Sequence, residues 1–541
     1  MKNAFQNSRQ VSSLFPVRKW LMALTMLLGI AVFYACSDDK IHELTLEPVV
    51  VIHVDNVTLS ASSVTLEKGN SETISVTISP TNASNKGVAW TSSNEAVATV
   101  DENGIITAVG VGEATVTATS KDGSKTVSCQ VTVTETAEVK KQRQALTALY
   151  QAMNGEQWSE RTAVNWCTNA SLGEWKGVTM EDDKVTGLVL EEANMMGEIP
   201  AEIKDLTYLT HLTIESALLK GNSLTNLFQL KNLTSLTLSS CGIEEQLPAS
   251  FYELTGLREV QITSCNLGDE LKPDIAKLAN LETLKLSNCN ITGTIPEEIT
   301  QLTQLTSLDL GYNKLKGDFA FISNMAQLKS LFLYGNLFEA IPSSIWTMAN
   351  LEVLYLDNID EIPESVGQMS ALTELVIWDN NLTTLPDEFA SLTNLKYIDI
   401  KGNFTEIPEV IGSLTQLESL DLSGAAIVSI PEWITQLTQL TDLSLMYNQI
   451  AGPLPEWIGT MTSLKSLNLY GNKITGDIPT SFYNLTNLTY LSLEGNRMTI
   501  QPTDELMNWL KGIEDAFIEN QNSIEEVEGN ESYEGHEIYW D

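Results

Sequence analysis

The stretch Leu284–Ile299 reads LKLSNCNITGTIPEEI, and variants of it recur along the chain. LTLSSCGIEEQLPASF begins at Leu236 and VQITSCNLGDELKPDI at Val260, so that each copy starts 24 residues before the next. Apolar residues hold the same positions in every copy, and a cysteine stands three residues after the second of them. Repetition at this period is typical of a solenoid in which each copy forms one coil.

Fourteen such units follow one another, and each reads L-x-x-L-x-L-x-x-N-x-L with small departures. They begin at residues 185, 209, 233, 257, 281, 305, 328, 351, 372, 395, 417, 440, 464 and 488. The L-x-L segment predicts a short strand with its leucines inside, a face that only stacking on neighbouring coils can bury. The pattern resembles leucine-rich repeats, mostly of the plant-specific type. That resemblance implies a curved solenoid whose exposed strand positions form a concave binding face.

One column of the repeat is polar and is expected to bond backbone groups that the turn after each strand leaves inside the solenoid. It holds Asn313, Asn336, Asn380, Asn403, Asn448, Asn472 and Asn496, and in three consecutive coils Cys241, Cys265 and Cys289. Their side chains should run parallel, one per coil, a poor arrangement for a disulfide or for tetrahedral metal ligation. We predict structural thiols. Ala193, Ala217, Ile359 and Ala425 interrupt the column, and Ile359 lies in the shortest coil, where we expect an irregularity.

The N-terminal region resembles a bacterial lipoprotein signal. Residues 1–35 combine four basic residues and no acidic one with the apolar run WLMALTMLLGIAVFYA, and Cys36-Ser-Asp-Asp follows. The cysteine resembles that of a lipobox, and the acids after it resemble the surface-export signal of Bacteroidota-type lipoproteins. The resemblance implies lipidation of Cys36 and anchoring in the outer membrane, facing the exterior, with residues 36–54 as a tether. The alternative is an ordinary cleaved signal peptide.

Residues 55–135 alternate polar and apolar residues in short runs, which predicts a small β-sandwich. The segments WTSSNEAVATVD from Trp90 and GIITAVGVGEATVTA from Gly104 resemble the bacterial Ig-like group 2 family. The resemblance implies a spacer or an adhesive module, and no binding residue is evident, so we favour a spacer. Cys129 should be a small buried residue of the last strand.

Residues 138–184 and 498–520 are expected to cap the two ends of the array. Leu146, Leu149 and Met153 follow helical spacing, and the segment with WKGV at 175–178 resembles the N-terminal cap of plant-type repeat proteins. That family often closes its cap with paired cysteines, but Cys167 has no evident mate. We therefore expect Trp158, Trp166 and Trp175 to close the end by packing. A helix is predicted around Leu506–Phe517, followed by an acidic tail at 521–541.

The fold class predicted from these segments is mainly β with short helices: an α/β leucine-rich-repeat solenoid of about 14 coils over residues 185–497, preceded by an Ig-like sandwich. Seventy acidic and 31 basic residues give a net charge of −39, which argues against nucleic acid and anionic lipid surfaces as partners. Membrane contact is expected through the N-terminal lipid only. With four scattered histidines and no catalytic or phosphate-binding motif, we predict no enzyme activity, no cofactor and no metal site.

Aromatic and acidic residues gather at the exposed strand positions of the middle coils. The candidate partner-binding residues are Tyr312, Phe332, Tyr334, Tyr355, Trp378, Tyr397, Asp357, Asp379, Asp399, Asp421, Tyr447 and Tyr470. We expect their rings to protrude without packing internally, as binding surfaces do, although aromatic residues also stabilise each other across strands. The function predicted is a lipid-anchored surface protein that captures a protein partner, in adhesion or host interaction. The alternative is glycan capture for nutrient uptake.

Overall fold

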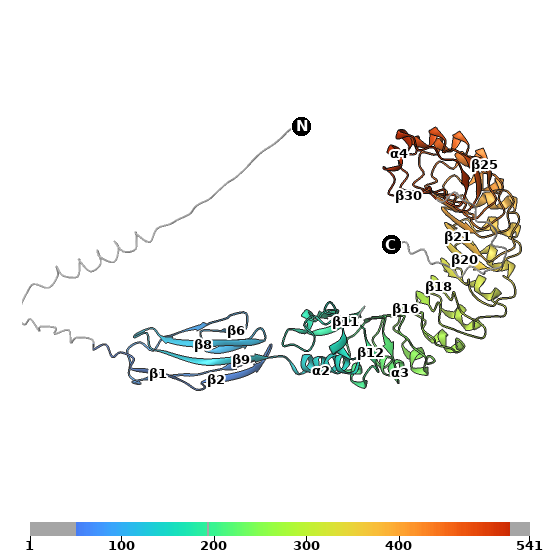
Figure 1. Cartoon of the computed structure of the whole chain (residues 1–541). Helices are drawn as coiled ribbons and strands as arrows, with labels where there is room; N and C mark the ends of the chain where they lie inside the picture. Colours follow the sequence, from blue (N-terminus) through green and yellow to red (C-terminus); the bar gives the residue numbers. More distant parts are fainter. Residues whose placement is uncertain (1–49, 192–193, 520–541) are drawn as a thin grey trace, which may run out of the picture. The chain divides into compact units, whose positions relative to one another are not determined.

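The computed structural model describes residues 50–191 and 194–519 (Figure 1). The chain forms two compact units that meet between Thr134 and Glu135, and each is described by itself. The signal peptide, Cys36, most of the tether, Ala193 and the acidic tail lie outside the described residues. Within the described residues, no helix has both the length and the apolar character needed to cross a bilayer.

The first unit is a β-sandwich, as predicted. Its four-stranded sheet has the order β2-β9-β8-β5, a three-stranded sheet has the order β3-β7-β6, and β1 pairs with β4. The strands are β1 (Asn56–Leu59), β2 (Ser63–Glu67), β3 (Ser71–Thr73), β4 (Val76–Ser79), β5 (Val88–Ser92), β6 (Ala98–Val100), β7 (Ile105–Ala108), β8 (Gly112–Ser120) and β9 (Thr126–Thr134). Inward residues of these strands form a main apolar core, in which Cys129 is fully buried, and a smaller cluster around Val57 of β1.

The second unit begins with a cap. Helix α2 (Ala137–Ala152) starts at Thr136, whose hydroxyl accepts the N–H of Val139 at 3.2 Å. Short helices η1 (Gly155–Gln157) and η2 (Leu172–Glu174) follow. Trp158 and Trp166 pack edge to face at 5.0 Å, Trp175 lies 5.2 Å from Trp166, and all three are buried. The rings close the apolar end of the solenoid, while Cys167 is a free, exposed thiol.

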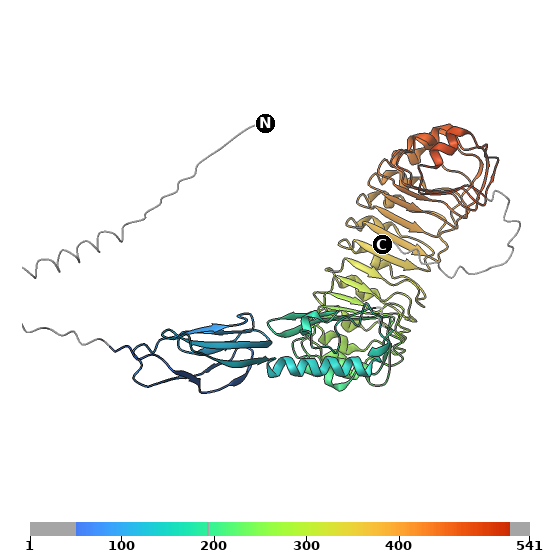
Figure 2. The same ribbon diagram turned by 60° about the vertical axis from the view of Figure 1, so that its left-hand side comes forward.

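One sixteen-stranded sheet runs through the repeats, parallel from its second strand onward. In order the strands are β10 (Val178–Glu181), β11 (Lys184–Leu190), β13 (His211–Glu215), β15 (Ser235–Ser239), β16 (Glu259–Thr263), β17 (Thr283–Lys285), β18 (Ser307–Asp309), β19 (Ser330–Phe332), β20 (Val353–Asp357), β21 (Glu374–Trp378), β22 (Tyr397–Ile400), β23 (Ser419–Asp421), β24 (Asp442–Ser444), β26 (Ser466–Asn468), β28 (Tyr490–Ser492) and β30 (Asp515–Phe517). Figure 2 shows the strands side by side. The sheet lines the inner side of the arc that the coils follow in Figure 1.

Short helices lie opposite the sheet, about one per coil. They are η3 (Ala201–Asp205), α3 (Ser223–Leu227), η4 (Ala249–Glu253), η5 (Pro273–Lys277), η6 (Glu297–Gln301), η7 (Ala320–Asn324), η8 (Ser343–Thr347), η9 (Glu364–Gln368), η10 (Asp387–Ser391), η11 (Glu409–Ser413), η12 (Glu432–Gln436), η13 (Glu456–Thr460) and η14 (Thr480–Asn484). Two small parallel sheets join the coils at one side: β12 (Met196–Gly197) with β14 (Leu218–Leu219), and β25 (Ala451–Pro453) with β27 (Lys473–Gly476) and β29 (Arg497–Met498). The predicted fold class is confirmed.

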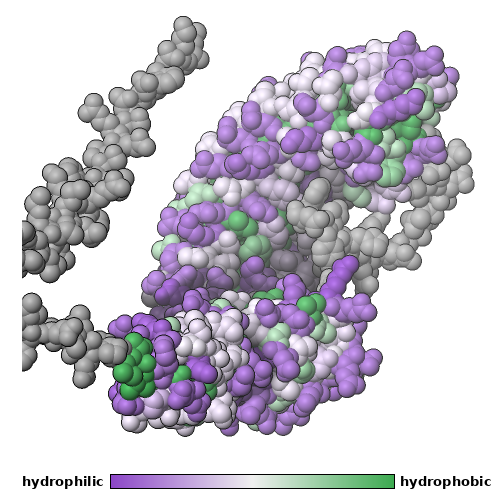
Figure 3. All heavy atoms as spheres, turned by 90° about the vertical axis from the view of Figure 1, so that its left-hand side faces the viewer, coloured by the Kyte–Doolittle hydropathy of each residue, from purple (hydrophilic) through white to green (hydrophobic). Residues whose placement is uncertain are grey.

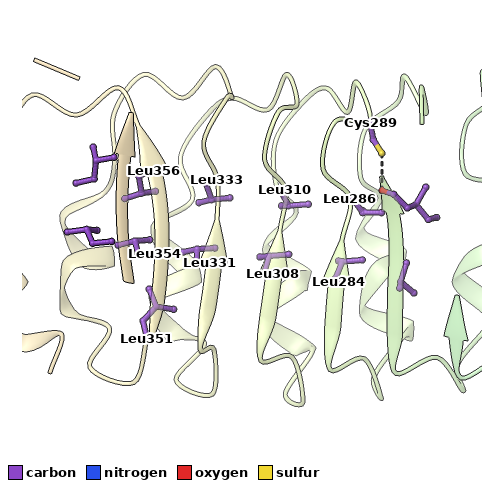
Figure 4. Close-up of a cluster of buried hydrophobic side chains, with 14 of the residues drawn as sticks. Leu284, Leu286, Cys289, Leu308, Leu310, Leu331, Leu333, Leu351, Leu354 and Leu356 are labelled. Atoms are coloured by element: carbon purple, nitrogen blue, oxygen red, sulfur yellow. Dashed lines mark hydrogen bonds between the residues drawn. The ribbon is translucent and has the colours of Figure 1, made fainter. Parts of the chain in front are cut away.

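The register of the sheet stacks equivalent leucines into one interior. Leu284, Leu308, Leu331 and Leu354 are direct partners in successive strands. Figure 4 shows these leucines and their companions two residues later pointing to the same side of the sheet. They belong to a single apolar cluster that runs from α2 to the C-terminal cap. Each coil therefore depends on its neighbours to bury its leucines.

The asparagine column bonds the backbone of its own coil and of the preceding one. Asn313 is typical: its side-chain oxygen accepts the N–H groups of Cys289 and Ile291 at 3.1 and 2.9 Å. Its side-chain nitrogen donates to the backbone oxygens of Leu286 and Leu310 at 2.8 and 3.0 Å. Asn336, Asn448, Asn472 and Asn496 make equivalent bonds.

Two asparagines depart from this pattern. Asn403 was expected in the column but is exposed, because the coil is one residue shorter before its next apolar residue, so that Phe404 fills the interior. Asn380 is buried and donates forward, to the backbone oxygen of Lys401 at 2.7 Å, and accepts the N–H of its neighbour Leu382. The irregularity expected at Ile359 lies in the coil before Asn380. There the side chain of Ile359 is buried in the interior, and Asn358 turns outward with a φ of 54°.

The three cysteines of the column are fully buried. The thiol of Cys289 lies 3.0 Å from the backbone oxygen of Ile262 (Figure 4), and that of Cys241 lies 3.1 Å from the oxygen of Ile214. Burial raises the pKa of the Cys289 thiol to about 12, so it stays protonated and can donate. Among the described cysteines all are free thiols, and the three in the column act as hydrogen-bond donors inside the solenoid.

These positions predict the order in which the thiols react. Cys167 should be modified by a thiol reagent in the folded protein, at a reduced rate because partial burial raises the pKa of its thiol. Cys129, Cys241, Cys265 and Cys289 should react only after denaturant is added. Mass spectrometry of the labelled peptides reads out the order, and fast labelling of Cys265 in native buffer would contradict the buried column.

The C-terminal cap differs from expectation in its second half. Helix α4 is shorter than predicted and spans Asp504–Leu510. Residues Asp515–Phe517 form β30, which pairs with β28 as the last strand of the sheet. The chain turns at Gly512, whose N–H bonds the oxygen of Trp509, and can therefore return to cover the open edge of the sheet.

Candidate functional site

The predicted aromatic residues lie on the outward face of the sheet, on strands β18 to β22 or just after them. We call Tyr312, Phe332, Tyr334, Tyr355 and Trp378 the aromatic patch. Tyr355 is the register partner of Phe332 on one side and of Val376 on the other. Tyr397 starts β22 beside the patch, and Tyr447 and Tyr470 form a separate edge-to-face pair, with ring centres 5.1 Å apart, in later coils.

The rings of the aromatic patch pack against one another edge to face. Tyr334 is central: its ring centre lies 4.8 Å from that of Tyr312, 5.7 Å from that of Tyr355 and 5.4 Å from that of Trp378. Phe332 and Tyr355 are 4.7 Å apart. Such contacts stabilise by about 0.5–1.5 kcal/mol each. The expectation that the rings do no internal packing is therefore wrong, and every ring except that of Tyr312 is half-buried.

Val376 shows what the rings cover. It lies between the inward residues Leu375 and Ile377 of β21, so its side chain is on the outward face, yet it is only 1 % exposed. It is absent from the interior apolar cluster, and its register partners are Tyr355 and Asp399. The patch is a small apolar layer of its own, outside the solenoid core.

Polar groups fix this layer across the coils. The hydroxyl of Tyr355 donates to the carboxylate of Glu374, and the indole N–H of Trp378 donates to Asp399 at 2.8 Å. The ammonium group of Lys401 lies 2.8 Å from both Asp399 and Asp421. Lys401 was not among the predicted site residues, although alternate residues of an extended segment share a face, which places it beside Asp399.

Asp399 and Asp421 consequently have an internal role. Asp399 is only 7 % exposed, and burial together with the charge of Asp421 raises its pKa in spite of Lys401. Burial by itself lowers the pKa of Lys401, but the two carboxylates outweigh it and raise that pKa. These two acids hold Trp378 and Lys401 in place and offer little to a partner.

Asp357 and Asp379 are placed differently. Asp357 accepts the N–H of Gly335 and forms no ion pair within residues 50–191 and 194–519. Burial, and then the nearby charge of Asp379, raise the pKa of Asp357 to about 6. Asp379 is exposed, and no ion pair to it occurs in the described chain either. These two carboxylates can meet a partner.

The turn after each strand holds its second residue in the left-handed region. Several coils place glycine there, among them Gly335, Gly424 and Gly471, because a side chain in this conformation costs about 1–2 kcal/mol. Tyr312 and Asp379 adopt it with φ values of 50° and 45°, and serine, asparagine or tyrosine does so in other coils, Tyr447 with a φ of 53°. A tyrosine at a position that favours glycine is a local strain of the kind that accumulates at functional sites.

Hydrophilic residues prevail on the face shown in Figure 3, and hydrophobic ones form small separate areas. In the described part of the chain no three His, Cys, Asp or Glu side chains converge as metal ligands would.

Comparison with known proteins identifies the modules. The bacterial Ig-like domain (group 2) model matches residues 53–131, and leucine-rich-repeat models match 232–254, 279–324 and 387–519. A leucine-rich-repeat protein of Leptospira interrogans is 32% identical over 59% of this chain and 80% of that one, with a TM-score of 0.51. The plant peptide hormone receptor RGFR1 in complex with RGF2 is 29% identical, covering 64% of this chain and 60% of that one, with a TM-score of 0.50.

A curated relative is similar over a short stretch. A 3-O-alpha-D-galactosyl-alpha-L-arabinofuranosidase of Bifidobacterium longum is 40% identical over 98 residues, which are 17% of this chain and 9% of that enzyme. The chain therefore spans less than a tenth of this relative's length. The likeness concerns one module, and the activity of the whole enzyme does not follow from it.

Proposed function

The chain belongs to the leucine-rich-repeat proteins and carries a group 2 bacterial Ig-like domain, and from this premise we propose that it captures a protein partner on the sheet face of its repeats. Both modules are typically binding domains without catalytic groups. Proteins of this fold bind partners, as the similar plant receptor in complex with RGF2 does. The Ig-like unit serves as a spacer that carries the repeats.

The observation that carries the proposal is the aromatic patch around Tyr334, together with the strained Tyr312 beside it. Stability alone would favour glycine at position 312, as at the equivalent Gly335 and Gly424. The ring is 45 % exposed and packs edge to face against that of Tyr334. An exposed ring retained in spite of backbone strain is typical of a residue kept for binding.

A glycan is the second candidate, because sugar rings also stack on tryptophan and tyrosine. The half-buried indole of Trp378, held by Asp399, offers such a surface. We favour a protein because the outward face continues over successive coils on both sides of the patch, and an extended partner can use that length. A small sugar would need a more enclosed site.

Tyr312→Gly tests the patch. We expect at least about tenfold weaker binding to the partner, while the free energy of unfolding stays within about 1 kcal/mol of wild type because relief of the left-handed backbone offsets the lost ring contact. Binding is read on arrays of purified extracellular protein domains and of glycans. Tyr208→Ala, which removes another exposed tyrosine outside the strands, is the control and should bind normally.

The arrays decide between the candidates. Binding of an identified protein domain that falls in Tyr312→Gly and persists in Tyr208→Ala supports the proposal. Glycan binding that is lost in Trp378→Ala, with no protein bound, overturns it in favour of glycan capture. A protein partner bound equally by wild type and Tyr312→Gly would place the site elsewhere.

We further propose that the protein is anchored through a lipid on Cys36 in the outer membrane and faces the exterior. These residues lie outside the described structure, so the support comes from the sequence of residues 1–39 alone. Protease added to intact cells should then remove the repeats, and Cys36→Ala should release the chain from the membrane fraction. Repeats that resist the protease until the outer membrane is opened would place the protein inside it.

A further inference from the structure

The outward face of the middle coils carries more negative charge than the ion pairs of the described residues neutralise. The acids at outward strand positions from β18 to β24, or directly after a strand, are Asp309, Asp357, Glu374, Asp379, Asp399, Asp421 and Asp442. Lys401, directly after β22, is bound to two of these acids, Asp399 and Asp421. The charge that remains lies beside the aromatic patch.

Contacts within the site join this charge to the rings. The N–H of Gly335 bonds Asp357, and a β-carbon added at Gly335 would lie 2.6 Å from the ring of Tyr312. Asp357 is also the register partner of Trp378 in the next strand, and Asp379 follows Trp378 directly. Tyr312 and Trp378 each pack on Tyr334. Carboxylates and ring edges or faces therefore meet in one small area.

We propose that this area, formed by Asp357 and Asp379 with the rings of Tyr312, Tyr334 and Trp378, is the seat for an arginine side chain of an extended segment of the protein partner. The inference rests on the proposed function and names the chemistry that the patch selects. Charge complementarity supports this occupant, because Lys401 on the same face is already engaged by Asp399 and Asp421.

Arginine suits the seat better than other residues for two reasons. Its planar guanidinium stacks on aromatic rings and is weakly hydrated, so it loses little on entering a half-buried site. Its fork of N–H groups can also bond two carboxylates at once, which the compact ammonium of lysine does less well. An extended segment is favoured because alternate side chains then point to the same face of the solenoid.

The seat is tested with a labelled peptide of alternating glycine and arginine, at low salt, by fluorescence anisotropy on the full protein. Asp357→Asn with Asp379→Asn should weaken binding at least about tenfold. Glu297→Gln with Glu298→Gln changes the net charge equally on η6, on the opposite side of the coil, and should leave binding within about twofold of wild type. The same peptide with neutral citrulline in place of arginine should bind neither the wild type nor either double variant.

Each outcome of the peptide assay supports or overturns the proposed arginine seat. Equal affinity of wild type and the Asp357/Asp379 variant for the peptide overturns the seat. An equal loss of affinity in both double variants would mean that only net charge matters, which also overturns it. A lysine peptide that binds as tightly as the arginine peptide overturns the choice of arginine. If the Asp357/Asp379 variant keeps an array partner that Tyr312→Gly loses, the seat is wrong and the proposed function stands.

A pH profile provides a second reading of the same seat. Asp379 is the charged group that faces Asp357. The N–H of Gly335 donates a hydrogen bond to the Asp357 carboxylate. Because the pKa of Asp357 is about 6, peptide binding by wild type should weaken as the pH falls from 7 to 5. Asp357→Asn should bind more weakly and lose most of this pH dependence. A pH profile identical to that of wild type would show that Asp357 is not the titrating group.

Discussion

Asn313→Ala is expected to lower the free energy of unfolding by about 3–5 kcal/mol, while the same change at Asn403 should alter it by less than about 0.5 kcal/mol. Both residues occupy the same column of the repeat in the sequence. Asn313 is buried and bonds backbone groups of two coils, including the N–H groups of Cys289 and Ile291. Alanine would leave these groups buried without partners, at about 1–3 kcal/mol each.

Chemical denaturation followed by circular dichroism measures the difference between the two variants. Hydrogen exchange adds a local reading, because in a solenoid the loss is concentrated in neighbouring coils. The amides of Cys289 and Ile291 should exchange faster in Asn313→Ala than in wild type. If Asn403→Ala were as destabilising as Asn313→Ala, the outward position of Asn403 would be refuted.

Lys401→Met is expected to lower the free energy of unfolding by about 2–4 kcal/mol at pH 7. The lysine lies 2.8 Å from both Asp399 and Asp421, and its removal leaves Asp399 buried beside a like charge. Removing one partner of a buried ion pair costs about 3–5 kcal/mol, and the 35 % exposure of the Lys401 side chain reduces that figure. The loss of the fixed Asp399 should also loosen Trp378.

The loss in Lys401→Met should shrink as the pH falls. The folded protein already holds the pKa of Asp399 above its ordinary value, and removal of Lys401 raises it further. In the unfolded chain the carboxyl keeps its ordinary pKa, so between these values the folded state binds the proton more tightly and gains stability relative to the unfolded one. The difference from wild type should therefore narrow from pH 7 toward pH 5.

Lys396→Met is the matched control for this prediction. Lys396 forms an ion pair with Glu418 at 2.6 Å, but both side chains are more than half exposed. Such pairs contribute about 0–1 kcal/mol, and the variant should show little pH dependence between 5 and 7. Thermal melts of the two variants across this range give the comparison. A flat pH profile for Lys401→Met would count against the internal role of Asp399.

The cysteines of Leu236–Ile299 show how much a repeat reveals before any coordinates. Their shared column, one per coil, predicted parallel buried thiols, and Cys241, Cys265 and Cys289 are free and fully buried. The column is strictly periodic there. Where the period slips, the same reasoning failed: the coil with Asn403 is shorter, and packing of Phe404 took precedence over the motif.

The candidate site was predicted as a set of residues but not as an arrangement. Columns of the repeat placed the rings of Tyr334, Tyr355 and Trp378 on adjacent strands, because the register follows from the period. That these rings cover Val376, and that Lys401 engages Asp399, depends on rotamers and side-chain lengths that no pattern contains. The sequence therefore could not predict that Asp399 and Asp421 are paired with Lys401 while Asp357 and Asp379 form no ion pair in the described chain.

The sequence by itself determined the solenoid, its number of strand-forming coils and which columns face inward, because a leucine every coil can be buried only by stacking. Tertiary structure decided which outward side chains are free to bind. Asp357 and Asp399 both lie on the outward face, in register with Trp378 and Val376, but a cation and an indole from neighbouring residues reach only Asp399. Three-dimensional packing determines which side chains contact each carboxylate. It therefore also determines which carboxylates can still form favourable contacts with a partner.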